Sequence, residues 1–150
     1  MKLFLIILTT VATLIVVGLW LLAQKSQTPP TLGLNDGNLL PCENLTNCVN
    51  TTQANQIDIA PIHYKGDAEA ALQNMVETLT SLGGKIEQTQ ATYLWATFKS
   101  PIFGFVDDVE VQQDTENQWF NIRSASRVGR SDFSANRLRV EKIREGFNRR

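Results

Sequence analysis

Residues 105–127 read FVDDVEVQQDTENQWFNIRSASR, two stretches of alternating side chains separated by a short polar turn. The apolar positions are mainly odd-numbered in the first stretch and even-numbered in the second. In an antiparallel pair the two apolar faces coincide only if odd positions lie opposite even ones. A two-residue turn at Glu116-Asn117 meets this condition and places Asn117 where a positive φ is tolerated. The segment therefore predicts a β-hairpin.

The register of this hairpin decides where its charged side chains lie. It places Glu110 opposite Arg123, and Asp108 diagonal to both Arg123 and Arg127, all on the polar face. A slip by one residue would turn the arginines into the core, so the register is well specified. We therefore expect ion pairs between the acids and the arginines of this face.

The apolar face of the hairpin is interrupted near one end. Asp107, Ser124 and Ser126 fall among its core-facing positions. The next segment predicts a C-terminal helix, and it adds further polar residues, namely Ser131, Asp132, Asn136, Arg137 and Arg139. Ser131 or Asp132 can cap this helix. An arginine in the first two turns is unfavourable for the helix macrodipole unless an acid is near, so we expect Arg137 to reach Asp107.

The segments before the hairpin complete the fold. Residues 68–82 carry apolar side chains at helical spacing, with Asp67 as N-cap and Gly83 at the C-terminal end. Residues 85–90 and 92–99 alternate with a period of two and predict strands. A further short strand is marked by Ile57, Ile59 and Ile62. Together these elements predict an α+β fold, an antiparallel sheet of four to five strands with two helices packed on one face.

An uncharged apolar run fills residues 3–23. As a helix this run spans about 31 Å, close to the ~30 Å hydrocarbon core of a bilayer. A cleaved signal peptide, which usually has a shorter apolar run, and a buried core helix are the alternative interpretations. We predict a transmembrane anchor over residues 1–23, a linker over residues 24–38 and one α+β domain over residues 39–150.

The cysteines bear on the side of the membrane where the domain lies. Cys42 and Cys48 are the only two, and outside the cytoplasm they can form a disulfide. Two reduced thiols, or a metal site completed by His63, are the alternatives. Lys2 and Lys25 give almost no charge bias across the apolar run. Our working topology is single-pass, with the C-terminal domain in the periplasm or an equivalent extracytoplasmic space.

Charge is unevenly distributed along the chain, although the formal net charge is −1. Residues 123–150 hold nine Lys or Arg against three Asp or Glu, and the rest of the chain is correspondingly acidic. A basic segment can bind nucleic acid, anionic lipid or an acidic partner. The near-neutral total and the extracytoplasmic location disfavour nucleic acid. The expected partners of the basic segment are therefore acids of the same chain.

The polar residues of the hairpin allow several kinds of chemistry. Asp107, Asp108 and Glu110 can hold a divalent cation or act in acid–base catalysis, but neighbours on a strand point to opposite faces, which favours ion pairing. The arginines can form a cleft for a carboxylate or phosphate. Ser124 and Ser126 lack a Gly-x-Ser-x-Gly context, and the single histidine is distant in sequence. Neither a metal site nor a cofactor is predicted.

Six short motifs stand out after the linker: LPC (40–42), NCV (47–49), GFVDDVE (104–110), RSASRVG (123–129), SD (131–132) and NRLR (136–139). In this combination the chain resembles the DUF1499 family over about residues 39–147. That family is of unknown function and occurs in bacteria and photosynthetic eukaryotes, often behind a signal or membrane segment. The resemblance implies the domain boundary and an extracytoplasmic location, but no activity.

The leading functional hypothesis is a membrane-tethered domain that binds an anionic small molecule or a protein partner through an Arg/Asp cluster. Residues 3–23 would supply the membrane contact. The alternatives are a hydrolase or metal-dependent enzyme using Asp107, Asp108 and Arg123, and a purely structural domain. The predicted cluster comprises Asp107, Asp108, Glu110, Arg123, Ser124, Ser126, Arg127, Asp132, Asn136, Arg137 and Arg139.

Overall fold

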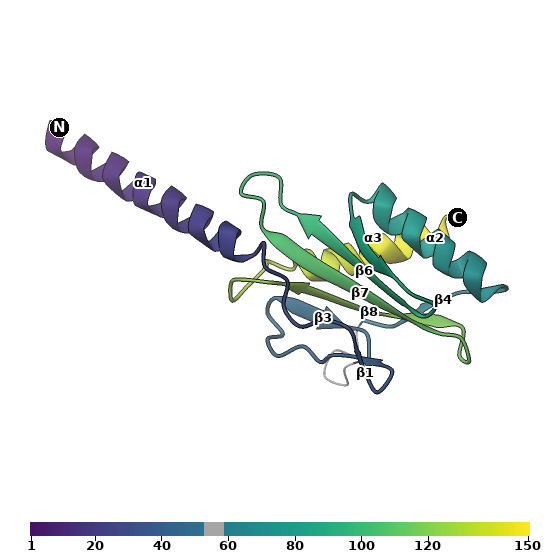
Figure 1. Cartoon of the computed structure of the whole chain (residues 1–150). Coiled ribbons are helices and arrows are strands. Elements are labelled where there is room, and N and C mark those ends of the chain that lie inside the picture. Colours follow the sequence, from purple (N-terminus) through teal and green to yellow (C-terminus); the bar gives the residue numbers. More distant parts are fainter. Residues whose placement is uncertain (53–58) are drawn as a thin grey trace.

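The computed structural model describes residues 1–52 and 59–150 (Figure 1). Its helices and strands are, in chain order, α1 (Lys2–Lys25), β1 (Leu34–Asn35), β2 (Asn38–Leu39), β3 (Cys48–Asn50), β4 (Ile62–His63), α2 (Ala68–Ser81), β5 (Lys85–Thr89), β6 (Tyr93–Lys99), β7 (Val106–Asp114), β8 (Trp119–Ser126) and α3 (Ala135–Asn148). The predicted α+β class is confirmed. Of the predicted strand around residues 57–62, Ile57 lies outside the described residues.

A six-stranded antiparallel sheet forms the centre of the domain. Its strand order is β3-β8-β7-β6-β5, and β4 pairs with β8 on the same edge as β3. The sheet has one strand more than the predicted four to five, because β3 lies in the cysteine loop. A strand of three residues, all of them buried, has no readable alternation and leaves no pattern in the sequence.

The central hairpin of β7 and β8 has the predicted register. Glu110 lies opposite Arg123, and the two strands are joined by residues 115–118. The positive φ falls on Gln118 (54°) and not on Asn117, so that detail of the turn prediction was wrong. The Asp114 carboxylate accepts hydrogen bonds from both the backbone and the side-chain amide of Asn117, which moves the left-handed conformation one residue along.

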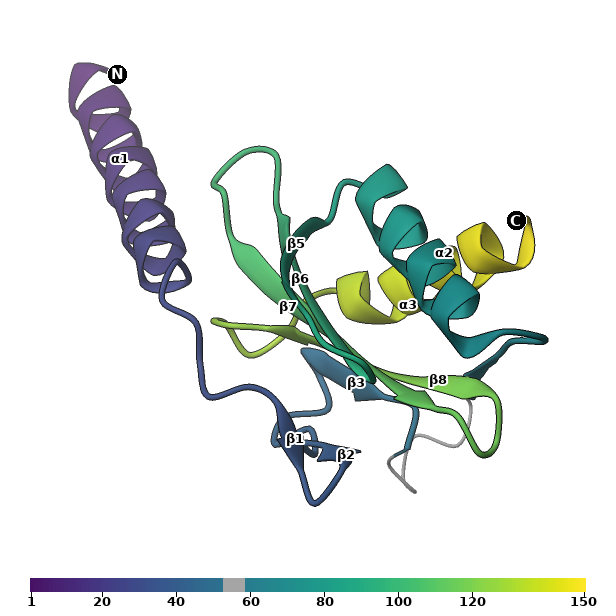
Figure 2. The same ribbon diagram turned by 45° about the vertical axis from the view of Figure 1, so that its right-hand side comes forward.

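Helices α2 and α3 cover one face of the sheet, as predicted (Figure 2). Asp67 caps α2 by accepting a hydrogen bond from the backbone N–H of Ala70. The core between the layers is apolar and comprises, among others, Met75, Leu79, Leu94, Val109, Val111, Phe120, Ile122, Val140 and Ile143. Burial of this one face is the main source of stability of the domain.

The opposite, polar face of the sheet is covered by the linker segment, residues 26–39, which includes β1 and β2. In both ribbon views this segment runs from the end of α1 beneath the sheet, on the side away from α2 and α3 (Figures 1 and 2). The backbone N–H of Gly33 donates to Glu110, and the carbonyl oxygens of Ser26 and Gln27 accept from Arg127. The linker segment therefore covers much of the charged face, and pockets beside Arg123 and Arg127 remain open at its margins.

Helix α1 has the length and composition of a membrane span, features that a signal sequence shares. Within it only Ala23 is buried against the rest of the chain. Beyond the linker, Cys42 and Cys48 form a disulfide, as one interpretation of the two cysteines predicted. It joins the cysteine loop to β3 at the edge of the sheet.

Candidate functional site

Arg127 ties the polar face of the sheet to the linker segment. Its guanidinium makes a two-point ion pair with the Asp108 carboxylate, at 2.8 and 2.7 Å. The same guanidinium donates to the carbonyl oxygens of Ser26 and Gln27, each at 3.1 Å. Asp108 also accepts from the indole N–H of Trp95 at 2.9 Å. Since both charged side chains are almost fully buried, this pair acts as a structural link.

Glu110 is the second buried acid of this face. It is fully buried and accepts three hydrogen bonds of 2.8 Å, from the Tyr93 hydroxyl, the Gly33 backbone N–H and the Arg123 guanidinium. Burial, followed by the neighbouring Glu110 carboxylate, raises the pKa of Tyr93 well above its usual value. Tyr93 therefore stays neutral and acts as a hydrogen-bond donor to the carboxylate.

A second polar cluster lies on the core side of the sheet, centred on the fully buried Asn136 at the start of α3. The Asn136 side chain accepts from the Ser124 hydroxyl at 2.6 Å and donates to Ser126 at 3.0 Å. It also donates to the backbone carbonyl of Asn47 and to the Asp132 carboxylate. This network joins β8, the cysteine loop and α3, so Ser124 and Ser126 act as hydrogen-bonding groups of the interior.

Asp107 forms its ion pair with Arg139, at 2.6 Å. The sequence predicts Arg137, and not Arg139, as the arginine that reaches Asp107. The Arg139 guanidinium also donates to Ser124, and it stacks over the Phe98 ring with 4.9 Å to the ring centroid. Arg137, two residues earlier on the helix, lines a separate pocket of about 290 Å³ beside the cysteine loop.

The predicted cluster is thus two networks separated by the sheet. On the linker side lie Asp108, Glu110, Arg123 and Arg127, and on the helix side lie Asp107, Ser124, Ser126, Asp132, Asn136 and Arg139. Arg123, Arg127 and Arg139 are each bound to a carboxylate of the same chain. Within the described part of the chain, no group of three His, Cys, Asp or Glu side chains is placed to hold a metal ion.

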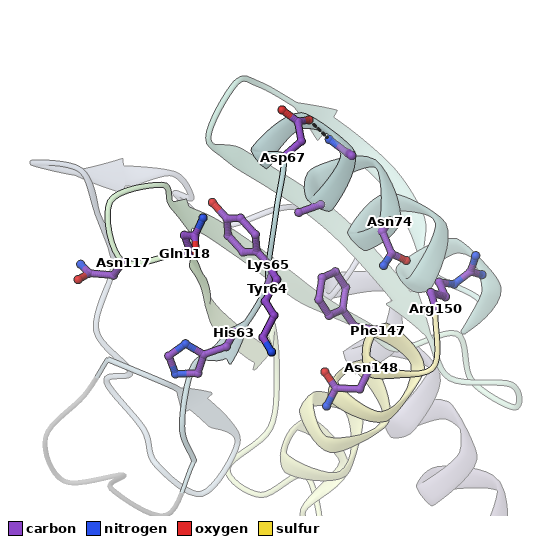
Figure 3. Close-up of a pocket in the computed structure, with 12 residues that line it drawn as sticks. His63, Tyr64, Lys65, Asp67, Asn74, Asn117, Gln118, Phe147, Asn148 and Arg150 are labelled. Atoms are coloured by element: carbon purple, nitrogen blue, oxygen red, sulfur yellow. Dashed lines mark hydrogen bonds between the residues drawn. The ribbon is translucent and has the colours of Figure 1, made fainter.

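A pocket of about 830 Å³ opens at another place, where β4, the start of α2, the β7–β8 turn and the end of α3 meet (Figure 3). Aromatic and small side chains form part of its wall, and the polar side chains are mostly amides and cations. The residues that line it are His63, Tyr64, Lys65, Asp67, Ala70, Ala71, Asn74, Asn117, Gln118, Phe147, Asn148 and Arg150. This volume falls within the range typical of small-molecule sites, about 300–1,000 Å³.

Two buried polar atoms in the wall of this pocket lack a partner among the described residues, the Tyr64 hydroxyl and the Asn74 side-chain oxygen. Tyr64 is 6% exposed, and its ring packs on Phe120 with 5.0 Å between centroids. Its backbone N–H donates to the Gln118 carbonyl, which fixes the wall of the pocket. A buried polar group without a partner costs about 1–3 kcal/mol, so each of these two atoms lowers the stability of the fold.

Comparison with known proteins supplies the family. The family model described as "Protein of unknown function (DUF1499)" matches residues 38–147. The chain belongs to the DUF1499 family. A search of curated proteins returns no match. The match covers the sheet and both covering helices, and it confirms the resemblance carried by the motifs of the cysteine loop, the hairpin and α3.

The motifs that mark the DUF1499 domain coincide with the two buried networks and not with the pocket. The pocket residues come from four places distant in sequence, and sequence reasoning missed them. His63 and Tyr64 gave no stronger signal than an aromatic pair at a strand edge, and Asn117 and Gln118 gave only a turn. Only the pairing of β4 with β8 brings these two segments together.

Proposed function

We propose that this DUF1499 protein is a single-pass, membrane-tethered extracytoplasmic domain that binds a small hydroxylated anion in the pocket beside Tyr64. The observation that carries the ligand site is a pocket of suitable size whose polar lining consists mostly of amides and cations. The side-chain amides in this lining include those of Asn117, Gln118 and Asn148, and each can both donate and accept. A ligand hydroxyl, which both donates and accepts, satisfies groups of both kinds.

A cation at the rim of the pocket favours an anionic ligand. Lys65 is exposed and forms no ion pair within the described residues. In Figure 3 its side chain extends toward Asn148 at the end of α3. Arg150 contributes a second cation, since its ion pair with Glu77 is solvent-exposed and therefore weak. A sugar acid, with several hydroxyls and one carboxylate, has this chemistry.

The Arg/Asp cluster is proposed as the framework that holds this domain together. An anion that bound through Arg123, Arg127 or Arg139 would have to displace a carboxylate of the chain. Breaking a buried pair costs about 3–5 kcal/mol, more than a small ligand readily returns. The pocket needs no such displacement, and on this ground we prefer it as the ligand site.

The membrane tether rests on α1 and on the disulfide. A 24-residue apolar helix fits a bilayer, and a disulfide is stable in oxidising compartments. In right-side-out membrane vesicles, an Asn117→Cys variant should react with a membrane-impermeant maleimide. Cys42 and Cys48 should resist alkylation until they are reduced. Labelling of residue 117 only after the vesicles are opened would contradict the topology.

The ligand site is tested by thermal unfolding of the full-length protein in detergent micelles with gluconate, glucuronate or inorganic phosphate. A probe at 100 times its Kd stabilises the folded state by about 2.7 kcal/mol. We expect a sugar acid to raise the Tm, and Lys65→Met to abolish the rise. Lys85→Met removes an exposed lysine of β5 and is the matched control. The ligand proposal fails if no probe raises the Tm, or if Lys65→Met retains the rise.

A further inference from the structure

The edge of the domain nearest α1 consists of two loops. Residues 100–105 join β6 to β7, and residues 127–134 join β8 to α3. Both ribbon views place these loops at the end of the sheet where α1 leaves the domain (Figures 1 and 2). The β7–β8 turn lies at the opposite end. The two loops are therefore the part of the domain that faces any bilayer entered by α1.

The end of α1 is fixed to this edge by direct contacts. The Gln27 side chain donates to the Gly104 carbonyl at 2.9 Å, and the Ser26 hydroxyl accepts from the Val106 backbone N–H at 3.1 Å. Ala23 and Ser26 are completely buried. Because the helix end is held by these contacts, the domain cannot rotate freely about a flexible linker. The two loops therefore stay close to the point where the helix ends.

These two loops carry the most exposed large apolar side chains outside α1 among the described residues. Ile102 is 83% exposed and Phe133 is 93% exposed. Phe133 and Ser134 both have positive φ, at 52° and 67°. Asp132 accepts from the Ser134 N–H, which holds this conformation. Strained backbone that presents an aromatic ring outward is typical of a functional contact.

Basic side chains accompany the apolar ones. Lys25, Lys99 and Arg130 are exposed at or next to these loops. None of the three forms an ion pair within residues 1–52 and 59–150. Apolar tips flanked by cations match a bilayer interface that contains anionic headgroups, where aromatic rings insert and Lys or Arg contact phosphates. If these loops bound a protein partner, nothing would require them to lie at the level of the end of α1, whereas a bilayer contact does require it.

We infer that the loops 100–105 and 127–134 rest on the bilayer that α1 enters, with Ile102 and Phe133 inserted among the lipid headgroups. This contact orients the domain so that the β7–β8 turn and the pocket beside it point away from the membrane. The inference rests on the proposed tether. It adds a second, lipid-facing surface to the protein, recognised by the chemistry of anionic phospholipid.

The test uses full-length protein in nanodiscs of phosphatidylcholine and phosphatidylglycerol. The native cysteines are joined in a disulfide, so one introduced cysteine can carry an environment-sensitive NBD label. Labels are placed by Leu14→Cys in α1, Ile102→Cys and Phe133→Cys in the loops, and Asn117→Cys in the opposite turn. Each label is exposed to a lipid-borne nitroxide quencher and to an aqueous quencher.

We expect the labels at residues 14, 102 and 133 to be quenched from the lipid and protected from the aqueous quencher, and the label at residue 117 to show the reverse. If residues 102 and 133 behave like residue 117 while residue 14 is quenched from the lipid, the edge contact is refuted and the tether stands. If residue 14 is not quenched from the lipid, the tether fails and the edge contact fails with it.

Discussion

Arg127→Met is the substitution that tests most sharply whether the charged face is an internal framework. The guanidinium makes two hydrogen bonds to Asp108 and one to each of two linker carbonyls, and its side chain is only 6% exposed. Methionine keeps much of the apolar stem but leaves the Asp108 carboxylate buried beside Trp95 alone. Removing one partner of a buried pair costs about 3–5 kcal/mol.

That cost is large against the roughly 5–15 kcal/mol by which a domain is stable. We expect the Tm of the full-length protein in micelles to fall by roughly 10 °C or more. Equilibrium denaturation followed by far-ultraviolet circular dichroism measures the free energy. Hydrogen exchange provides a second measurement, because the linker segment loses two of its contacts with the sheet and its amides should exchange faster.

A double-mutant cycle with Asp108→Asn separates the ion pair from simple loss of packing. If the two charges stabilise each other, the double variant loses less than the sum of the single variants. Arg130→Met, an exposed arginine three residues further on, is the matched control and should change the stability by no more than about 0.5 kcal/mol. A loss below about 1 kcal/mol for Arg127→Met, with additive single variants, would refute the framework interpretation.

Three other expectations concern individual polar groups. Tyr93→Phe should lower the unfolding free energy by about 1.5–3 kcal/mol, because a charged acceptor loses a donor. Tyr64→Phe removes a buried hydroxyl that has no partner among the described residues, so it should raise the unfolding free energy, by about 1–3 kcal/mol; denaturant titration compares the two. Asn136→Ala removes the centre of a buried network and should cost about 3 kcal/mol in the same assay; an effect below about 1 kcal/mol would contradict its role. Hydrogen bonds from the Asn117 side chain, and then from its backbone, lower the pKa of Asp114 in the folded state. This carboxylate therefore stabilises the fold above its unfolded pKa of about 4, and that stabilisation is lost as the pH falls through the folded pKa. Thermal unfolding between neutral and acidic pH should therefore show a smaller acid loss in Asp114→Asn than in the natural chain.

The sheet could be predicted where alternation and burial act together. The β7–β8 register followed from parity, because a shift by one residue would have exchanged the core and the charged face. Helix α2 followed from its apolar spacing and the Asp67 cap. These signals are local and repeated over many residues, so a single sequence is enough to read them.

The choice between Arg137 and Arg139 could not be made from the sequence, because it depends on where α3 begins. Asp132, one of the two predicted caps, does accept from the Asn136 backbone N–H in the first turn, but the helix itself begins only at Ala135, after two residues of positive φ. Each residue of a helix turns the side-chain direction by 100°, since there are 3.6 residues per turn, so an error of a few residues changes which arginine faces the sheet. The pocket could not be predicted from the sequence either, because it forms between segments that only the completed sheet brings together.

Hydrogen-exchange mass spectrometry of the full-length protein with and without saturating glucuronate is the most direct test of where a ligand binds. We expect slower exchange in residues 62–67 and 115–118 and at the end of α3, with no change in β7 or in residues 123–130. The Lys65→Met variant should lose this protection, whereas Lys85→Met should keep it. Protection that appeared instead over residues 107–110 and 123–130 would show that the Arg/Asp cluster is the ligand site, and it would contradict the assignment of that cluster as an internal framework.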